Sequence, residues 1–170
     1  MKNKNVVIIF CTIVGIIMLC GISCNIVFPL KYKNEINEYA RQYQLSPTLV
    51  CAVICAESRF DVNARSASGA CGIMQIMPTT FDWINLQLGI NNADIFNYND
   101  NIKTGCFYLN YLFKKYQNII YVLACYNAGE GVVNSWGNCK NFSIGMVRYK
   151  ETETYINRVL CYEKIYRLRY

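Results

Sequence analysis

The feature that most restricts the fold of this chain is an uncharged block over residues 6–28, "VVIIFCTIVGIIMLCGISCNIVF". A bilayer is crossed by about 20 consecutive apolar residues, so this block is long enough to span one. We expect residues 1–30 to form one N-terminal hydrophobic helix that acts as a signal anchor at the cell membrane, single-pass, with the rest of the chain outside the cytoplasm. The folded core must then come from residues 31–170, which are enough for a single compact domain.

The block allows other interpretations. It is also consistent with a cleaved signal peptide, because Gly21 and Ser23 are small residues spaced for a signal peptidase. The domain would then be secreted. Ser23 and Cys24 also fit a lipoprotein signal, although glycine stands three positions before the cysteine. A buried core helix of this length would be unusual.

Charge and composition narrow the function. The net charge is +6, of which Lys2 and Lys4 supply +2 and the domain the remaining +4. This suits an anionic partner such as a cell wall or a lipid surface, and ordinary solubility equally well. No basic cluster interleaved with aromatic residues indicates nucleic acid as a partner. The chain has no histidine, which excludes Ser-His and Cys-His nucleophile pairs and most zinc sites, so we expect no metal and no cofactor.

Ten cysteines are present, seven of them after residue 30, and none forms a CxxC pair. Cys51 and Cys55 lie four residues apart within an apolar helical pattern, where cysteine behaves as a small hydrophobic residue. We interpret most of the cysteines as core residues, and a disulfide framework as the lesser possibility.

Apolar residues spaced three and four apart predict a mainly α domain with at most a small β element. Helices are expected over 31–44, from 47 to about 58, from 78 to about 88, from 98 to 116, over 119–127 and over 151–168. Ser46, Asn97 and Asn118 are the predicted N-caps. Residues 61–77 read as a glycine-containing loop with one or two short extended pieces, and residues 132–150 as irregular.

The second of these helices ends on an unusual residue. Val50, Val53, Ile54 and Glu57 share one face, so a carboxyl group closes an apolar stripe just before the loop. Burial disfavours the charged form of a carboxyl group and raises its pKa. A carboxylic acid that stays protonated near neutral pH can donate a proton to the leaving oxygen of a glycosidic bond. The alternative is a semi-buried glutamate with a hydrogen-bond partner.

Glycosidases usually need a second carboxylate. Asp61 and Asp82 are the nearest candidates, but Asp61 is placed to cap the loop and Asp82 to favour the first turn of the next helix. A carboxyl group that works alone would need its substrate to supply the nucleophile.

Four segments resemble the catalytic domain of the soluble-lytic-transglycosylase-like family, which is related in fold to goose-type lysozyme. They are residues 57–78 "ESRFDVNARSASGACGIMQIMP", 101–109 "NIKTGCFYL", 126–129 "YNAG" and 151–155 "ETETY". The resemblance implies a lysozyme-like fold for residues 31–170. It also implies cleavage of the bond between N-acetylmuramic acid (MurNAc) and N-acetylglucosamine (GlcNAc) in the glycan strands of peptidoglycan. Glu57 would be the single acid and base, and the C6 hydroxyl of MurNAc the nucleophile, which closes a 1,6-anhydro ring.

The resemblance also implies substrate-binding roles. Ser66 and Ser68 match positions that hydrogen-bond substrate, although serine also caps loops well. Gln75 matches a groove residue that contacts the acetamido sugar. Met77 matches a residue that flanks the cleavage site, or is a core methionine. Tyr126 would direct its hydroxyl towards Glu57 or the sugar, or be a core aromatic with a satisfied hydroxyl.

Three other positions are less specific. Asn127 matches the same motif as Tyr126 and is expected to hold the turn. Glu151 either caps the last helix or lines the groove. Glu130 stands where the family often has proline, which concerns the rigidity of the loop rather than the acid.

Two other functions stay open. A hydrolytic lysozyme of the same fold would use water in place of the C6 hydroxyl, and would need a base to hold that water. A membrane-tethered glycan-binding subunit of a wall-spanning machine would have no need of a buried acid.

Overall fold

The computed structural model describes residues 25–170. Residues 1–24 lie outside the described residues, and so does most of the predicted membrane segment 6–28. The prediction of an N-terminal hydrophobic helix therefore stays a prediction. Of the described residues, 25–31 belong to a small unit separate from 32–170, and 25–27 are helical. No helix in the described part of the chain is long and apolar enough to cross a membrane.

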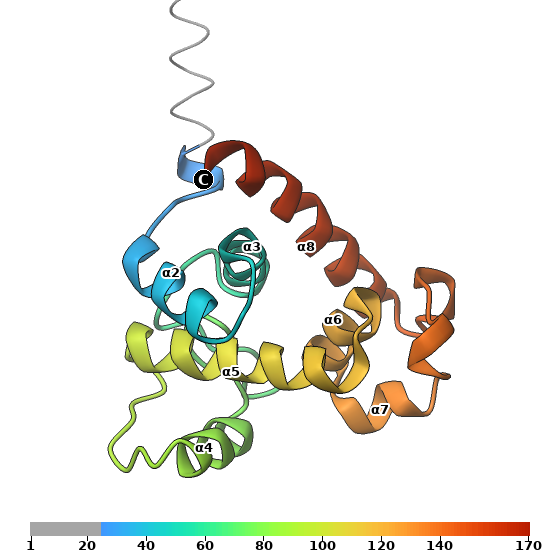
Figure 1. The fold of residues 1–170 in the computed structure, drawn as a ribbon, viewed down its shortest axis with the longest axis horizontal. Coiled ribbons are helices and arrows are strands. Elements are labelled where there is room, and N and C mark those ends of the chain that lie inside the picture. Colours follow the sequence, from blue (N-terminus) through green and yellow to red (C-terminus); the bar gives the residue numbers. More distant parts are fainter. Residues whose placement is uncertain (1–24) are drawn as a thin grey trace, which may run out of the picture. The chain divides into compact units, whose positions relative to one another are not determined.

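Residues 32–170 form a helical domain (Figure 1). Its elements are α2 (Lys33–Gln42), α3 (Pro47–Glu57), α4 (Pro78–Gln87), α5 (Tyr98–Tyr116), α6 (Ile119–Ala128), α7 (Glu130–Asn134), the 3₁₀ turns η1 (Cys139–Asn141) and η2 (Ile144–Met146), and α8 (Lys150–Arg169). Between residues 25 and 170 the only β pairing consists of two isolated bridges, Arg65 with Cys71 and Cys71 with Ile76. The predicted mainly α fold is confirmed.

Helix α3 forms the centre of the core. Every residue from Thr48 to Cys55 is buried, whereas the sequence pattern predicted a single buried stripe. A helix that is apolar on all sides must be covered on all sides, and α3 packs against α8 and α2, which lie on either side of it in Figure 1. Five of the seven cysteines among residues 25–170 are buried and none of the seven forms a disulfide, so the prediction that most of them are core residues is confirmed for this part of the chain.

All three predicted residues occupy N-cap positions, and two of them make side-chain capping bonds. Asn97 accepts hydrogen bonds from the backbone N–H groups of residues 99 and 100, and Asn118 from those of residues 120 and 121. Ser46 occupies the N-cap position of α3, but its hydroxyl lies 2.7 Å from that of Thr48 and makes no capping bond. Ser46 is thus the N-cap residue as predicted, but its hydroxyl pairs with the neighbouring threonine hydroxyl and does not cap the backbone.

The segment 132–150 was expected to be irregular, but it contains the end of α7 and the two turns η1 and η2. Helix α6 ends at Gly129, whose φ of +86° suits glycine, and α7 begins at the next residue. Glu130, which stands where the family often has proline, opens α7. Its carboxylate pairs with Lys115 and accepts a 2.5 Å hydrogen bond from the Tyr116 hydroxyl. Polar contacts with α5 therefore hold the start of α7 in this chain.

Candidate active site

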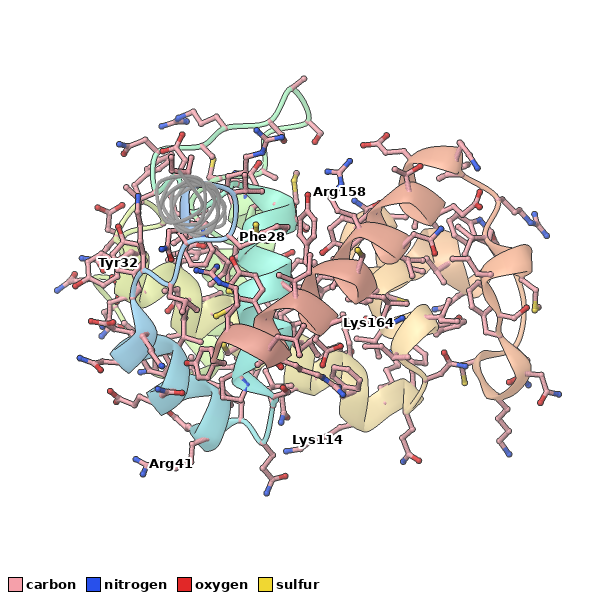
Figure 2. The ribbon with its side chains drawn as sticks, turned by 90° about the horizontal axis from the view of Figure 1, so that it is seen from above. Phe28, Tyr32, Arg41, Lys114, Arg158 and Lys164 are labelled. Atoms are coloured by element: carbon pink, nitrogen blue, oxygen red, sulfur yellow. The ribbon has the colours of Figure 1, made fainter. Side chains whose placement is uncertain are left out.

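Glu57 is the last residue of α3, and α8 covers the side of α3 on which it lies. Its side chain keeps some contact with solvent and is closely enclosed by protein on the other sides. This burial raises the pKa of Glu57 to about 7, although the Tyr155 hydroxyl and the positive charge of Arg158 act in the opposite direction. Arg158 projects from α8 (Figure 2). A substantial share of Glu57 is therefore a neutral acid at neutral pH.

Tyr155 lies beside this carboxyl group. Its hydroxyl is buried and makes no hydrogen bond of normal geometry within the described residues, yet it is close enough to Glu57 for each group to influence the pKa of the other. Burial and the nearby carboxylate raise the pKa of Tyr155 well above its usual value. Tyr155 is thus a neutral donor, available to the carboxylate form of Glu57 after a small movement.

The loop after Glu57 is fastened to the helices by buried hydrogen bonds. The Ser58 hydroxyl donates to the carbonyl oxygen of Ile73 at 2.6 Å. The fully buried amide of Asn101 accepts from the N–H of Met74 at 2.8 Å and donates to the carbonyl oxygens of Cys71 and Ile95. Because each of these groups would be costly to bury alone, the loop is held in one conformation relative to α5.

A glycine is required where this loop meets α5. Gly72 has a φ of +78°, and a Cβ atom there would lie 2.3 Å from Asn101 Nδ2 and 2.5 Å from the carbonyl oxygen of Ile95. Neither atom belongs to a flexible side-chain end, because the Asn101 amide is itself fixed by three hydrogen bonds. The loop can therefore approach α5 this closely only without a side chain.

Gln75 lies at the inner edge of the loop with a φ of +50°. Its side-chain Nε2 donates to the carbonyl oxygens of Ala64 and Gly72 at 3.0 and 2.9 Å. The amide oxygen is not needed for these two bonds, so it can accept a hydrogen bond from a ligand. Such an acceptor suits the N–H of an acetamido group.

The two serines have different surroundings. The Ser66 hydroxyl accepts from the N–H of Ala70 at 3.0 Å and lies 2.9 Å from the hydroxyl of Ser68. Ser66 thus acts as a loop cap and also lies at the cavity edge, while Ser68 has no contact with backbone and stays exposed. The loop-capping role of Ser66 is therefore observed, and its substrate-binding role stays a prediction.

Tyr126 and Asn127 come from the end of α6. The Tyr126 hydroxyl donates to the carbonyl oxygen of Met74 at 3.0 Å, rather than to Glu57, although its pKa is raised by burial and by the nearby Glu57 charge. Asn127 accepts a 2.8 Å hydrogen bond from the Thr152 hydroxyl at the start of α8, which supports the expectation that it holds the turn. These bonds join three separate segments at the cavity wall.

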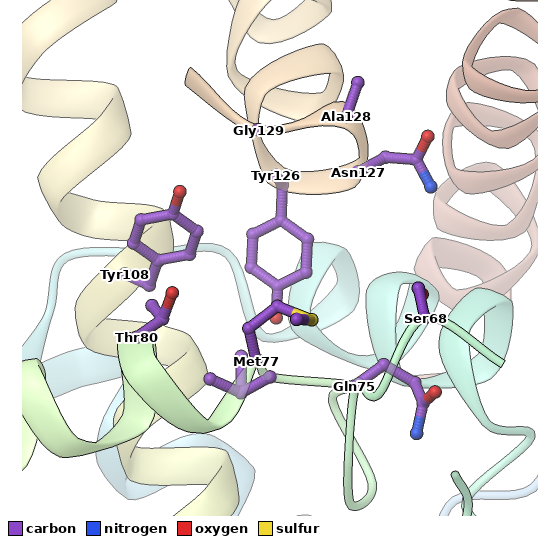
Figure 3. A pocket seen from close by; sticks show the side chains of 10 residues that line it. Ser68, Gln75, Met77, Thr80, Tyr108, Tyr126, Asn127, Ala128 and Gly129 are labelled. Atoms are coloured by element: carbon purple, nitrogen blue, oxygen red, sulfur yellow. The ribbon is translucent and has the colours of Figure 1, made fainter. Parts of the chain in front are cut away.

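Two adjoining cavities of about 270 and 190 Å³ form one groove. Both are lined by Ser68, Gln75, Met77, Tyr126 and Asn127. Figure 3 shows the Tyr126 ring reaching from α6 towards Met77 and the loop that carries Gln75. The smaller cavity also contains the predicted acid, and the larger one extends over Thr80 and Tyr108. All seven predicted site residues therefore line this one groove, and Met77 is 41% exposed rather than a core methionine.

The carboxylates other than Glu57 are differently placed. Asp61 accepts the N–H of Asn63 at 2.9 Å in a local turn, and neither Asp61 nor Asp82 lines the groove. Asp82 lies in the second turn of α4 rather than the first, which corrects its predicted position. Glu151, in the first turn of α8, is exposed and lines the same cavity as Glu57. No cluster of metal-binding side chains occurs between residues 25 and 170.

Sequence reasoning missed four residues that shape the site. Tyr155 and Arg158 lie three apart on α8, which places them on one face, but nothing in the sequence shows that this face covers Glu57. Ser58 and Asn101 were noted only as members of motifs. A buried polar side chain in an apolar helix face is the signal that would have selected Asn101.

The groove therefore holds an enclosed carboxylic acid, Glu57, which can donate a proton to a bound ligand near neutral pH. The sequence model of the transglycosylase SLT domain matches residues 34–144. The chain belongs to the transglycosylase SLT domain family.

Three known proteins illustrate the relationship. The chain is 31% identical over 151 residues to the soluble lytic murein transglycosylase of Salmonella typhimurium, covering 82% of this chain and 23% of that protein. It matches the solved structure of an inactive glutamate-to-glutamine variant of the lytic transglycosylase Slt of Pseudomonas aeruginosa with a TM-score of 0.78, at 29% identity and over 86% of this chain and 25% of the other. It matches the 70 kDa soluble lytic transglycosylase in complex with bulgecin A with a TM-score of 0.76, at 30% identity and over 83% of this chain and 25% of the other.

The chain thus spans about a quarter of the length of these relatives. Other relatives are named membrane-bound lytic murein transglycosylases, so the relatives include proteins named as soluble and proteins named as membrane-bound.

Proposed function

We propose that this chain is a peptidoglycan lytic transglycosylase that cleaves the β-1,4 bond between MurNAc and GlcNAc, with Glu57 as its single general acid and base. The observation that carries the proposal is the enclosure of Glu57, which raises its pKa to about 7 at the wall of a groove. Such a group is protonated often enough to act as an acid and ionises easily enough to act as a base near neutral pH.

The reaction has two steps in this proposal. Glu57 first gives its proton to the oxygen that links the two sugars, and the bond from that oxygen to C1 of MurNAc breaks. The C6 hydroxyl then attacks C1, and the Glu57 carboxylate takes up the hydroxyl proton. The product is 1,6-anhydro-MurNAc, no water is consumed, and Glu57 ends protonated as it began. Tyr155 is placed to donate a hydrogen bond to the carboxylate between the steps.

The groove residues divide the task of holding the glycan. The free amide oxygen of Gln75 accepts the N–H of an acetamido group, and the exposed Ser68 hydroxyl bonds to sugar oxygens. The exposed Met77 side chain packs against the ring beside the cleaved bond. Tyr126 and Asn127 position the wall through their bonds to Met74 and Thr152 and leave the opposite edge of each side chain to the ligand.

The test is a digest of purified peptidoglycan with products measured by mass spectrometry. We expect muropeptides that are one water lighter than hydrolysis products, and a loss of rate of about 10²–10⁴-fold in the Glu57→Gln variant. Glu151→Gln is the matched control, since it removes the second carboxylate of the same cavity and should leave the anhydro product in place. Products that carry an added water, lost in Glu151→Gln, would instead make this protein a lysozyme in which Glu151 holds the water.

We also propose that residues 6–28 anchor the protein in the cell membrane with residues 31–170 outside the cytoplasm. The support is the length of the uncharged block, together with an activity whose substrate lies outside the cytoplasm. Protease treatment of intact spheroplasts should then digest the domain. In a separate experiment without protease, the intact protein should stay in the membrane fraction after alkaline washing. Recovery of a shortened protein in the medium would indicate a cleaved signal peptide.

A further inference from the structure

An aromatic surface continues from the groove across two helices. Tyr108 lines the larger cavity, and its ring centroid lies 5.5 Å from that of Tyr126. On its other side Tyr108 stacks on Tyr111, with centroids 6.3 Å apart and ring planes at 11°. Tyr111 in turn contacts Trp83 of α4, with centroids 5.4 Å apart and planes at 76°. A chain of ring contacts therefore leads from the cavity wall to Trp83.

The helices give this chain of rings a direction. Thr80 and Trp83 are three residues apart on α4, and Tyr108 and Tyr111 are three apart on α5, so each pair lies on one helix face. Thr80 and Tyr108 line the cavity (Figure 3), and the second member of each pair lies about one turn further along its helix. The rings of Tyr108, Tyr111 and Trp83, which we call the aromatic platform, thus begin at the edge of the groove and lead away from it.

The exposure and chemistry of the platform suit a saccharide. Trp83 is 39% exposed although Phe107 and Tyr111 support its ring. Single exposed apolar residues are common, but this one continues a row of rings that starts in a binding groove. Aromatic faces are electron-rich, so they attract the C–H faces of sugar rings, while indole N–H and phenol groups can bond to sugar hydroxyls.

We propose that Trp83 and Tyr111 form an additional subsite for the glycan strand beyond the groove, which gives this protein a preference for long strands. The proposal rests on the proposed function for the identity of the ligand. Trp83 and Tyr111 are specificity residues in this proposal and take no part in the chemistry.

The test measures binding of peptide-free peptidoglycan glycans to the full chain carrying Glu57→Gln, so that no cleavage occurs. Two ligands are compared, a tetrasaccharide and strands at least twice that length. We expect the long strands to bind more tightly, and Trp83→Ala to weaken their binding about tenfold while the tetrasaccharide is unaffected. Trp83→Leu keeps apolar volume against Phe107 but has no flat ring, and should show the same loss. Leu86→Ala is the matched control on the same helix and should change neither affinity.

Equal losses for both ligands, or no loss for the long strands in either Trp83 variant, would overturn the subsite. The proposed function is judged separately, from the products of the protein with Glu57 intact. Anhydro products combined with no effect of Trp83 refute the subsite alone. A length preference that depends on Trp83, without any cleavage by the intact protein, refutes the enzymatic proposal alone.

Discussion

The hydroxyl of Ser58 donates a 2.6 Å hydrogen bond to the carbonyl oxygen of Ile73, and so joins the residue after Glu57 to the loop that carries Gln75. This short bond thus helps to hold the acid and one wall of its groove in register. Its removal should affect both stability and activity.

In Ser58→Ala the Ile73 carbonyl oxygen loses its donor, which should lower the free energy of unfolding by about 1–2 kcal/mol. The loop should also shift relative to Glu57, with a loss of kcat/KM of about tenfold. Urea unfolding and the rate of peptidoglycan solubilisation measure the two effects. Ser135→Ala is the control, since Ser135 makes a similar 2.7 Å bond to a helix carbonyl on the exposed α7. A destabilised variant of full activity would show that the loop does not depend on this bond.

The rate should depend on pH through Glu57. The first step needs the protonated acid, and the pKa of Glu57 is about 7, so the rate should fall about tenfold per pH unit above that value. Arg158 lowers the pKa of Glu57, and its replacement in Arg158→Gln should therefore move the alkaline limb to higher pH. Lys164→Gln removes a positive charge further along α8 (Figure 2) and should leave the limb in place. Equal shifts in both variants would point to general charge rather than to Arg158.

Stability should depend on pH in the opposite sense to that of a salt-bridged acid. The pKa of Glu57 is about 7 in the folded state, against about 4.3 for an unfolded glutamate, so between these values the folded protein binds more protons than the unfolded chain. The protonated Glu57 therefore contributes fully to the free energy of unfolding below pH 4, and this contribution is lost as the pH rises through 7.

Glutamine does not ionise, so Glu57→Gln should be more stable than the natural protein at pH 8, on the order of 3 kcal/mol, and similar to it at low pH. Chemical unfolding at the two pH values measures this difference. Glu151→Gln, an exposed change in the same cavity, should alter stability little at either pH. If Glu57→Gln gave no advantage at pH 8, the carboxyl group would have to be hydrated rather than enclosed.

Two glycines of the loop should respond differently to alanine. Gly72→Ala adds a Cβ atom at 2.3 Å from Asn101 Nδ2 as well as strain at positive φ, and should cost more than about 2 kcal/mol. Gly69 has a φ of +93° but nothing within 4 Å of its Cβ position, so Gly69→Ala should cost only the backbone strain of about 1–2 kcal/mol. Urea midpoints compare the two variants. Equal costs would mean that the contact with Asn101 relaxes freely.

The parts of the fold that depend on local chemistry could be predicted from the sequence. Asn97 and Asn118 cap their helices by accepting hydrogen bonds from N–H groups two and three residues further along the chain. This interaction is local, so the sequence alone indicates it. Glu57 ends its helix as predicted because its position depends on the spacing within that helix. Ser46 also occupies its predicted N-cap position, but its hydroxyl pairs with that of Thr48 and makes no capping bond.

The parts that depend on packing between helices could not be predicted. The burial of α3 on every side follows from its contact with α8, and so does the placement of Tyr155 beside Glu57. Two arrangements were predicted for the Tyr126 hydroxyl, and it adopts the one in which it is satisfied within the protein, by the carbonyl oxygen of Met74. A resemblance to a family located the groove residues, while their partners became visible only in three dimensions.

Glu57 belongs to the most deeply buried helix, whereas the groove wall belongs to a loop attached by a few side-chain bonds. Amino-acid substitutions in the loop therefore need not disturb the helix that carries Glu57. Under the proposed function, we expect substitutions along residues 61–70 or on the outer face of α4 to alter which glycans are accepted without moving the acid. The domain is therefore a suitable starting point for redesigning substrate preference by exchanging the loop, provided that Ser58, Gly72 and Asn101 are kept as its attachment points.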